Sequence, residues 1–378
     1  MASIPALVAE LERLTSENFS SEQSRFTSVQ ARAKFTRLTE TLGALSRDAA
    51  ENVYYLSTRT AQNSAVRCAI SLQLFDLVPA DEGKAISTKE LASGSEADPL
   101  LVERLMRVLA SCGVFDQVDE DLYVHNHLSR CFINKNNRDQ FQQMYEFVGK
   151  GVYGMADYLE KTGWKSPEGY EDAPVSVALG VQQGGFFEYL AASPERQALF
   201  SSGMQSRPES ISIAALYPFI EELNGRGDII KTAFPDIKGR FILQDQEAVI
   251  EDARAKDLPA YIEPQAASFF QPNPVKNARA YLFRRIFHDW SDPLSVVILS
   301  NTVSAMGRDS KVLIADVEMP VQQAPWFVTL QDWNMMALGG IERTDKQWKA
   351  LLTKAGLVLA KVWRVEGSNH VVVEGRLP

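Results

Sequence analysis

The segment at residues 278–293, ARAYLFRRIFHDWSDP, constrains the fold most, because its residue pattern changes in the middle. The first half is apolar and aromatic with a few positive side chains, which predicts a buried strand. The second half predicts the start of a helix, since Asp292 can cap the first turn and Pro293 suits the first helical position. His288 then lies between a strand end and a helix start, where open α/β sheets bind ligands. Taken alone, this histidine is equally consistent with a polar turn residue that neighbouring backbone satisfies.

The pattern from Gly239 onward alternates between strands and helices, which predicts a doubly wound α/β sheet. The predicted strands are 240–245, 279–284 and 311–316, followed by a hairpin of 357–365 and 370–374. Helices are predicted at 246–255 and 345–355, the latter with a capping box formed by Thr344 and Gln347. A hairpin after parallel units predicts antiparallel strands at one edge of the sheet.

Four side chains that can carry chemistry follow these strands, namely Asp245, His288, Asp316 and Glu342. Asp245 ends the strand where a nucleotide ribose is commonly held, because a carboxylate accepts both ribose hydroxyl protons. Histidine can remove a proton from a phenol-type hydroxyl near neutral pH. Asp316 and Glu342 are candidates to bond the other ring nitrogen, which fixes the tautomer. Each acid taken singly is also consistent with a helix cap or a solvated loop charge.

Three helices and a small two-stranded wing predict a winged helix in the first half of the chain. The helices are expected at 64–77, from Ser87 or Thr88 onward, and at 98–110, and the wing at 114–124. The third helix offers Arg104 and Arg107 against Asp98 and Glu103, and the wing is acidic, so DNA binding is disfavoured. A role in dimerisation or as a lid is favoured instead.

Other predicted helices carry large apolar faces. The helices at 4–14 and 26–46 have larger apolar faces than the edge of one domain would bury. These faces are consistent either with a partner surface or with packing inside the chain. Those at 138–160 and 181–222 are rich in aromatic residues and methionine. Such residues suit either a core or a roomy apolar substrate pocket.

The composition narrows the classes of protein that fit. The 378 residues favour two domains, and the net charge of -9 argues against nucleic acid as a partner. Three cysteines without metal-ligand spacing predict free, buried thiols in a reducing compartment and no metal site. The first residues lack the features of a signal peptide, and no window is apolar enough to span a membrane. A soluble, cytoplasmic protein is therefore expected.

These motifs together resemble the plant- and fungal-type S-adenosylmethionine-dependent O-methyltransferases, the group that includes caffeate and flavonoid methyltransferases. The most specific match is HDWSD at 288–292, which is similar to the family's general-base motif. The segment IERT at 341–344 resembles one whose glutamate helps hold the base. The resemblance implies that His288 is the base and that Asp316 and Glu342 are its supporting acids.

The same resemblance implies S-adenosylmethionine as the cofactor. Asp245 matches the acid that holds the ribose, and Arg284 matches a basic residue beside the cofactor. Ser268 and Phe269 stand where the family has an acid and its neighbour near the adenine. The family's winged-helix domain implies a homodimer, and its substrates imply a small aromatic or polyketide-type partner.

The sequence departs from the family just before Phe234, Pro235 and Asp236. The family has a strand and a loop of the form V-D-x-G-G-G-x-G there, whereas residues 221–233 read EELNGRGDIIKTA. Without them, two neighbouring strands lose ladder partners, and the backbone that approaches the cofactor's methionine part is missing. Three explanations are open: another segment fills the gap, the chain folds poorly, or the difference is an aberrant splice or gene-model product. We favour the last, because both flanks match the family.

The expected fold is α/β, a Rossmann-like methyltransferase domain that lacks its first strand, preceded by a mostly helical winged-helix dimerisation domain. The expected boundaries are 1–130 for the dimerisation domain, 131–222 for a helical substrate-pocket connector and 223–378 for the methyltransferase domain. The expected activity is O-methylation of a small aromatic or polyketide-type secondary metabolite. The alternative is a pericyclase-like or inactive member that has lost cofactor binding, and a winged-helix regulator is the least favoured hypothesis.

Overall fold

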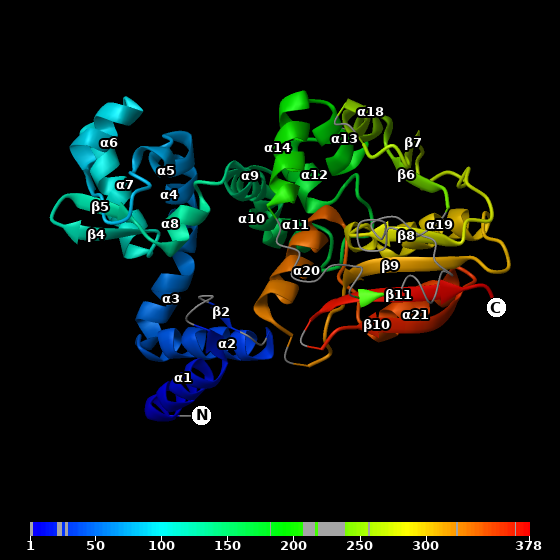
Figure 1. Cartoon of the computed structure of the whole chain (residues 1–378), viewed down its shortest axis with the longest axis horizontal. Helices are drawn as coiled ribbons and strands as arrows, with labels where there is room; N and C mark the ends of the chain where they lie inside the picture. Colours follow the sequence, from blue (N-terminus) through cyan, green and yellow to red (C-terminus); the bar gives the residue numbers. More distant parts are fainter. Residues whose placement is uncertain are drawn as a thin grey trace. The chain divides into compact units, whose positions relative to one another are not determined.

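The computed structural model of the chain divides into two compact units, whose elements are labelled in Figure 1. It describes residues 3–20, 25–26, 29–181, 183–206, 216–217, 239–255, 258–322, 324–366 and 368–378. Unit 1 comprises Met1–Phe147 with Ser193–Pro208, and unit 2 comprises Val148–Ala192 with Glu209–Pro378. The division expected from the sequence, with boundaries at 130 and 222, stays a prediction.

Unit 1 begins with helices, two of which have side-chain caps at their starts. Ser3 accepts the amide of Ala6 at the start of the first helix, and Asp48 forms a capping box with Glu51 at the start of the third. The first two helices contact each other. The elements are α1 (Ile4–Asn18), β1 (Phe19–Ser20), β2 (Arg25–Phe26), α2 (Val29–Leu45) and α3 (Ala49–Ser57).

The expected winged helix follows in unit 1 and is confirmed. Its elements are α4 (Arg59–Ser71), α5 (Leu74–Leu77), β3 (Ile86–Ser87), α6 (Thr88–Ser95), α7 (Pro99–Ser111), β4 (Phe115–Asp119) and β5 (Leu122–His125). The three strands form an antiparallel sheet in the order β3-β5-β4. Ser87 caps α6 and Asp98 caps α7, and Met106 and Phe115 lie in the core between helices and wing.

The cysteines are free, but the expectation that they are buried is wrong. Cys68 and Cys131 are exposed, and Cys112 is only partly covered. On α4 the buried positions are taken by Ala65, Val66 and Ala69, so the helix turns Cys68 to the other side.

The single helix expected at 138–160 is broken into several shorter ones. The elements are α9 (Lys135–Gln143), a π-helical turn η1 (Met144–Val148), α10 (Gly149–Tyr153) and α11 (Met155–Lys161). Gly154 ends α10 and precedes α11, which explains the last break. The helix expected at 181–222 is described only in part, as α13 (Gly185–Ala191) and α14 (Pro194–Gln205), because most of 207–222 lies outside the described residues.

The main sheet of unit 2 has four strands in the order β10-β11-β9-β8. The strands are β8 (Ala280–Arg284), β9 (Lys311–Val317), β10 (Val358–Arg364) and β11 (His370–Arg376). β8 and β9 are parallel, whereas β11 is antiparallel to both β9 and β10. The expected parallel units closed by an antiparallel hairpin are therefore confirmed.

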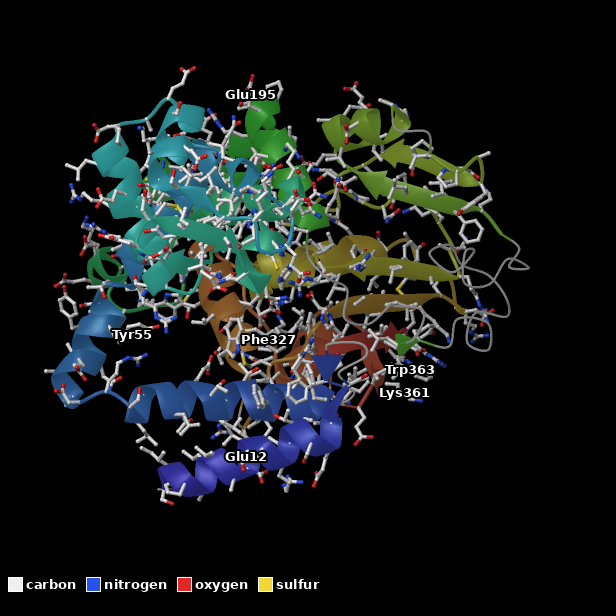
Figure 2. All side chains as sticks on the ribbon, turned by 60° about the vertical axis from the view of Figure 1, so that its left-hand side comes forward. Glu12, Tyr55, Glu195, Phe327, Lys361 and Trp363 are labelled. Atoms are coloured by element: carbon white, nitrogen blue, oxygen red, sulfur yellow. The ribbon has the colours of Figure 1, made fainter. Side chains whose placement is uncertain are left out.

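The two faces of this sheet are covered differently. One face packs against α19 (Asp292–Val303) and α21 (Asp345–Lys354) in an apolar core. The other face carries a buried ion pair, in which the Lys311 ammonium lies 3.5 Å from the Glu374 carboxylate. Trp363 donates its ring N–H to that carboxylate, and the Lys361 ammonium lies 3.4 Å from the Trp363 ring centroid (Figure 2).

A second, two-stranded parallel sheet holds the first part of the α/β pattern. It consists of β6 (Phe241–Asp245) and β7 (Ile262–Ala266), with α18 (Glu247–Ala255) after β6. Phe241 packs with Leu313, Ala315 and Val372 of the main sheet. Among the described residues no strand connects β6 to β8, and the segment 221–236, where the family has a strand and a glycine-rich loop, lies outside them.

The start of α19 differs from the expectation at one residue. Ser291 occupies the N-cap position, and Asp292 is the first residue of the helix, so the proposed Asp292 cap is wrong. The Asp292 carboxylate instead accepts a hydrogen bond from Arg343 at 2.9 Å, which explains why it does not turn back onto the helix.

Three helices of unit 2 meet, and two of them, α12 and α20, were not predicted. α10 and α12 (Pro174–Leu179) contact each other, and both contact α20 (Trp326–Leu338). Pro325 before α20 and Gly339 after it are the signals that could have revealed it.

Within the described residues no helix is long and apolar enough to cross a membrane. The cytoplasmic location stays a prediction.

The close contact of α10 with α12 depends on a glycine, and a substitution tests it. A Cβ on Gly151 would lie 2.7 Å from the backbone nitrogen of Val175, so Gly151→Ala forces two helices apart. We expect the free energy of unfolding in urea to fall by about 1–3 kcal/mol. Gly43→Ala in α2 is the matched control, because its Cβ would meet only the Arg47 guanidinium at an ordinary contact distance of 3.8 Å, and it should be neutral or stabilise by about 0.5 kcal/mol. Equal effects of the two substitutions would contradict this packing.

Candidate active site

The three proposed catalytic side chains lie together at the carboxyl ends of β8 and β9. His288 is in a short turn, η2 (Phe287–Asp289), after β8 and is 3% exposed. Its Nδ1 lies 2.9 Å from Oε1 of Glu342, which is also buried. Because a carboxylate accepts, this contact assigns the proton to Nδ1 and leaves the lone pair on Nε2. The ring is therefore held in the tautomer that can accept a proton at Nε2.

The two acids expected beside the ring have different positions. Glu342 takes the ring nitrogen, whereas Asp316 accepts the backbone N–H of His288 at 3.2 Å. Burial raises the pKa of Asp316, and the neighbouring His288 and Arg285 act in the opposite direction. Asp316 thus contributes to the position of the His288 backbone more than to the orientation of its ring.

The segment 339–344 lies directly against the His288 turn. Ile341 donates its backbone N–H to the carbonyl of His288 at 2.9 Å. Gly340 makes this approach possible, because a Cβ there would collide with the same carbonyl oxygen. Asp332 of α20 accepts the backbone N–H of Glu342 at 2.8 Å and so fixes the start of the acid's side chain.

Arg343 holds both ends of the His288 turn. Its guanidinium donates to the carbonyl of Phe287 at 2.6 Å and to the carbonyl of Trp290 at 2.8 Å, and it also bonds Asp292. The side chain is fully buried, and its guanidinium lies 5.2 Å from the ring centroid of Trp348. These bonds join residues more than fifty positions apart, so no local sequence pattern indicated them.

The residues proposed for the cofactor lie at the ends of other strands. Asp245 ends β6, Ser268 and Phe269 follow β7, and Arg284 ends β8. The Ser268 hydroxyl accepts the backbone N–H of Phe270 and closes a turn there. The structure thus brings each of them to the carboxyl end of a strand, in two separate sheets.

Five aromatic rings pack together around the turn after β7. The ring of Trp290 lies 5.6 Å from that of Phe269 and 4.9 Å from that of Phe270, in edge-to-face contacts. Tyr170 and Phe187 contact the same indole ring. The turn after β7 is therefore packed against the turn that carries His288.

The residues at the strand ends fit S-adenosylmethionine. The Asp245 carboxylate accepts the backbone N–H of Gln246 through Oδ1 at 2.8 Å and can accept ribose hydroxyls with its remaining lone pairs, and the aromatic turn at Phe269 offers a surface for the adenine. The guanidinium of Arg285 has a buried nitrogen, Nη1, with no hydrogen-bond partner in the part of the chain that the structure describes. That donor suits the carboxylate of the methionine part.

A metal ion is a geometric alternative at the base. His288, Asp316 and Glu342 each offer a ligand atom, and these atoms lie within 4.8 Å of one another. However, the Nδ1 of His288 already bonds Glu342, and Asp316 already accepts the His288 amide. The absence of a metal, expected from the sequence, stays a prediction.

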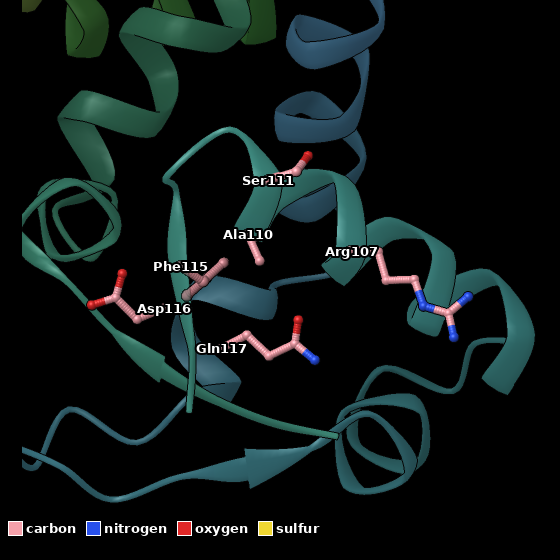
Figure 3. A pocket seen from close by; sticks show the side chains of 6 residues that line it. All are labelled: Arg107, Ala110, Ser111, Phe115, Asp116 and Gln117. Carbon is pink, nitrogen blue, oxygen red and sulfur yellow. The ribbon is translucent and has the colours of Figure 1, made fainter. Parts of the chain in front are cut away.

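A shallow hollow on the winged helix offers no comparable chemistry. It has a volume of about 440 Å³ and is seen in Figure 3. Its lining includes Arg107, which pairs with Glu103, and Asp116, which accepts the side-chain amide of Asn126. Its charged groups are therefore engaged in structural contacts.

Comparisons with known proteins agree on one family. The O-methyltransferase domain matches residues 167–358, and the O-methyltransferase dimerisation domain matches residues 55–135. O-methyltransferase GME11366 from Pestalotiopsis microspora is 37% identical over 90% of this chain and 88% of that protein. The structure of OxaC in complex with SAH and oxaline has a TM-score of 0.87 at 28% identity and covers 98% of each chain. A structure described as a pericyclic reaction enzyme shares the fold, with a TM-score of 0.85 at 24% identity over 99% of each chain.

The buried guanidinium of Arg343 can be tested without removing its charge. Arg343→Lys keeps one positive charge but cannot bond two carbonyls and a carboxylate at once. We expect the free energy of unfolding in urea to fall by about 2 kcal/mol or more, since several buried acceptors lose their donor. Arg364→Lys is the matched control, because this arginine pairs with Glu318 near the surface. It should change the free energy by less than about 1 kcal/mol, and an equal loss in both variants would contradict the role of Arg343.

Proposed function

The chain belongs to the O-methyltransferase family, and we propose that it transfers a methyl group from S-adenosylmethionine to a hydroxyl of a small aromatic or polyketide-type secondary metabolite. The observation that carries the proposal is the buried contact of 2.9 Å between Nδ1 of His288 and Glu342. A hydroxyl is a weak nucleophile until its proton is removed, and this pair provides a base of the required kind.

His288 acts as the general base in this proposal. Its Nε2 accepts the proton of the substrate hydroxyl, and the ring becomes positively charged. The Glu342 carboxylate at Nδ1 stabilises that charge, and Asp316 holds the backbone beneath the ring. The cofactor supplies a methyl carbon bonded to a positively charged sulfur. The residues of the chain therefore have to bind, align and deprotonate, which is what this reaction needs.

Cofactor contacts are assigned to Asp245, Ser268, Phe269 and Arg284. Their positions at strand ends support this, since ligands bind at the carboxyl ends of strands in open α/β sheets. The complex of OxaC with SAH supports the same class of cofactor.

An apolar substrate is supported by buried methionine and aromatic residues of unit 2. Met155 on α11, Phe186 on α13 and Met335 on α20 are buried in unit 2. Methionine and aromatic side chains adapt to flat apolar molecules. The complex of OxaC with oxaline shows that a similar chain binds a small molecule.

A homodimer is proposed through the first unit, which contains the segment 55–135 that matches the dimerisation domain, together with α3, which begins just before that segment. In the first unit α3 exposes large apolar side chains, with Val53 at 70% and Tyr54 at 72% exposed. Tyr55 on the same helix lies under the guanidinium of Arg47, 3.8 Å from its ring centroid (Figure 2). Exposed apolar groups of this kind are typical of a partner surface. Neither nucleic acid nor a membrane is proposed as a partner.

The second candidate is a non-methylating, pericyclase-like or inactive member that has lost cofactor binding. It is favoured by the sequence at 221–233, which lacks the glycine-rich loop of the family. Titration calorimetry with S-adenosylmethionine separates the two candidates. Micromolar binding would exclude the second candidate, and absence of binding would favour it.

The base can be tested by one substitution. His288→Ala should lower the rate of methyl transfer by about 10²–10⁴-fold, because proton removal loses its acceptor. The affinity for S-adenosylmethionine should change little, since the ring is assigned to the substrate. Transfer of labelled methyl groups to a panel of phenols and polyketides measures the rate, and calorimetry measures the affinity.

His127→Ala is the matched control for this test, because His127 is an exposed histidine on α8 (His127–Cys131) in unit 1. It should leave the rate unchanged. If transfer survives in His288→Ala, the assignment of the base is wrong.

A further inference from the structure

Arg285 has an unusual backbone conformation for its residue type. It follows β8 directly and has a φ of 55°, in the left-handed region that costs free energy for residues with a Cβ. Its backbone N–H bonds the carbonyl of Ala315 at 3.0 Å, which continues the ladder with β9. Backbone strain of this kind clusters at ligand sites, where the side chain it directs has a function.

The side chain of Arg285 has an unused donor. Its Nη1 is buried and has no hydrogen-bond partner within the described ranges, and it lies 3.8 Å from Oδ1 of Asp316, beyond hydrogen-bond distance. Asp316 instead accepts the amides of His288 and Val317. A buried guanidinium nitrogen without an acceptor is costly, so a ligand acceptor would satisfy it.

Other positive or potentially positive groups surround this donor. Arg284 pairs with Ala315 in the β8–β9 register, and His370 pairs with Val317 in the β9–β11 register. Alternation along strands places Arg284 and His370 on the same face of the sheet. The pKa of His370 is lowered by burial and by the charges of Arg285 and Arg284, which shows that the three groups are electrostatic neighbours.

We propose that Arg285 binds the carboxylate of the methionine part of S-adenosylmethionine, with Arg284 and His370 beside it. This inference rests on the proposed function. The adenosine part is assigned to β6 and β7, and the methyl group has to reach a hydroxyl beside His288, so the methionine part comes to lie by β8. A guanidinium fork matches a carboxylate, and the backbone amides of the family's glycine-rich loop are absent from this sequence.

The test compares two ligands and one substitution on the full chain. Asparagine tolerates the left-handed region, so Arg285→Asn removes the guanidinium without adding backbone strain. S-adenosylhomocysteine carries the carboxylate, and 5′-methylthioadenosine keeps the adenosine and the sulfur but lacks the amino-acid part. Calorimetry measures the affinity of both chains for both ligands.

Arg285→Asn should lower the affinity for S-adenosylhomocysteine by about tenfold or more. It should change the affinity for 5′-methylthioadenosine by less than about twofold. Arg240→Gln is the control, since Arg240 lies at the surface beside Glu263, and it should change neither affinity. An equal change for both ligands, or none, would overturn the inference. So would a variant that loses affinity only for acceptor substrates carrying a carboxylate.

A measurement on the unsubstituted chain keeps the inference testable if the variant folds poorly. The carboxamide analogue of S-adenosylhomocysteine, in which the carboxylate is neutral, should bind about tenfold or more weakly than the parent ligand. Equal affinities would overturn the carboxylate site and leave the proposed methyl transfer standing. Failure of the unsubstituted chain to bind S-adenosylhomocysteine at all would overturn the proposed function and this inference together.

Discussion

The buried guanidinium of Arg343 is the interaction on which the geometry of the site depends. It joins the turn after β8 to the start of α19, because it bonds the carbonyls of Phe287 and Trp290 as well as the Asp292 carboxylate. A buried charge is costly unless its hydrogen bonds are satisfied, and here the acceptors converge from one turn. The turn and the segment 339–344 are therefore joined by several buried hydrogen bonds.

In this arrangement, the atoms that hold His288 in position differ from the atoms that take part in proton transfer. Backbone atoms carry the support, since the amide of His288 bonds Asp316 and its carbonyl bonds Ile341. The imidazole ring bonds Glu342 through Nδ1, so Nε2 carries the lone pair that a base requires, and Oδ1 of Asp289 lies 3.5 Å from Nε2. A ring held in this way loses little freedom when a substrate binds, which favours proton transfer.

Local sequence patterns predicted those features of the structure that depend on neighbouring residues. The capping box at Thr344, the parallel strands and the approach of Glu342 to His288 all follow from spacing and residue type, or from the family resemblance. The bonds of Arg343, and the close approach that Gly340 permits, join distant segments, so no spacing rule reveals them. The left-handed backbone of Arg285 was equally hidden, because arginine rarely adopts it.

Because the α/β pattern is divided into two sheets, the groups that donate hydrogen bonds to the cofactor have to be identified. β6 and β7 are held to the main sheet through side chains, as Phe241 packs on Leu313 and the Asn301 amide bonds the carbonyl of Phe269. A glycine-rich loop would supply backbone amides to a bound carboxylate, and this sequence does not contain that motif. Side-chain donors at the end of β8 can replace such amides, because one guanidinium offers several N–H groups with a permanent charge. A chain of this kind can therefore keep the ligand while the means of binding moves from backbone to side chain.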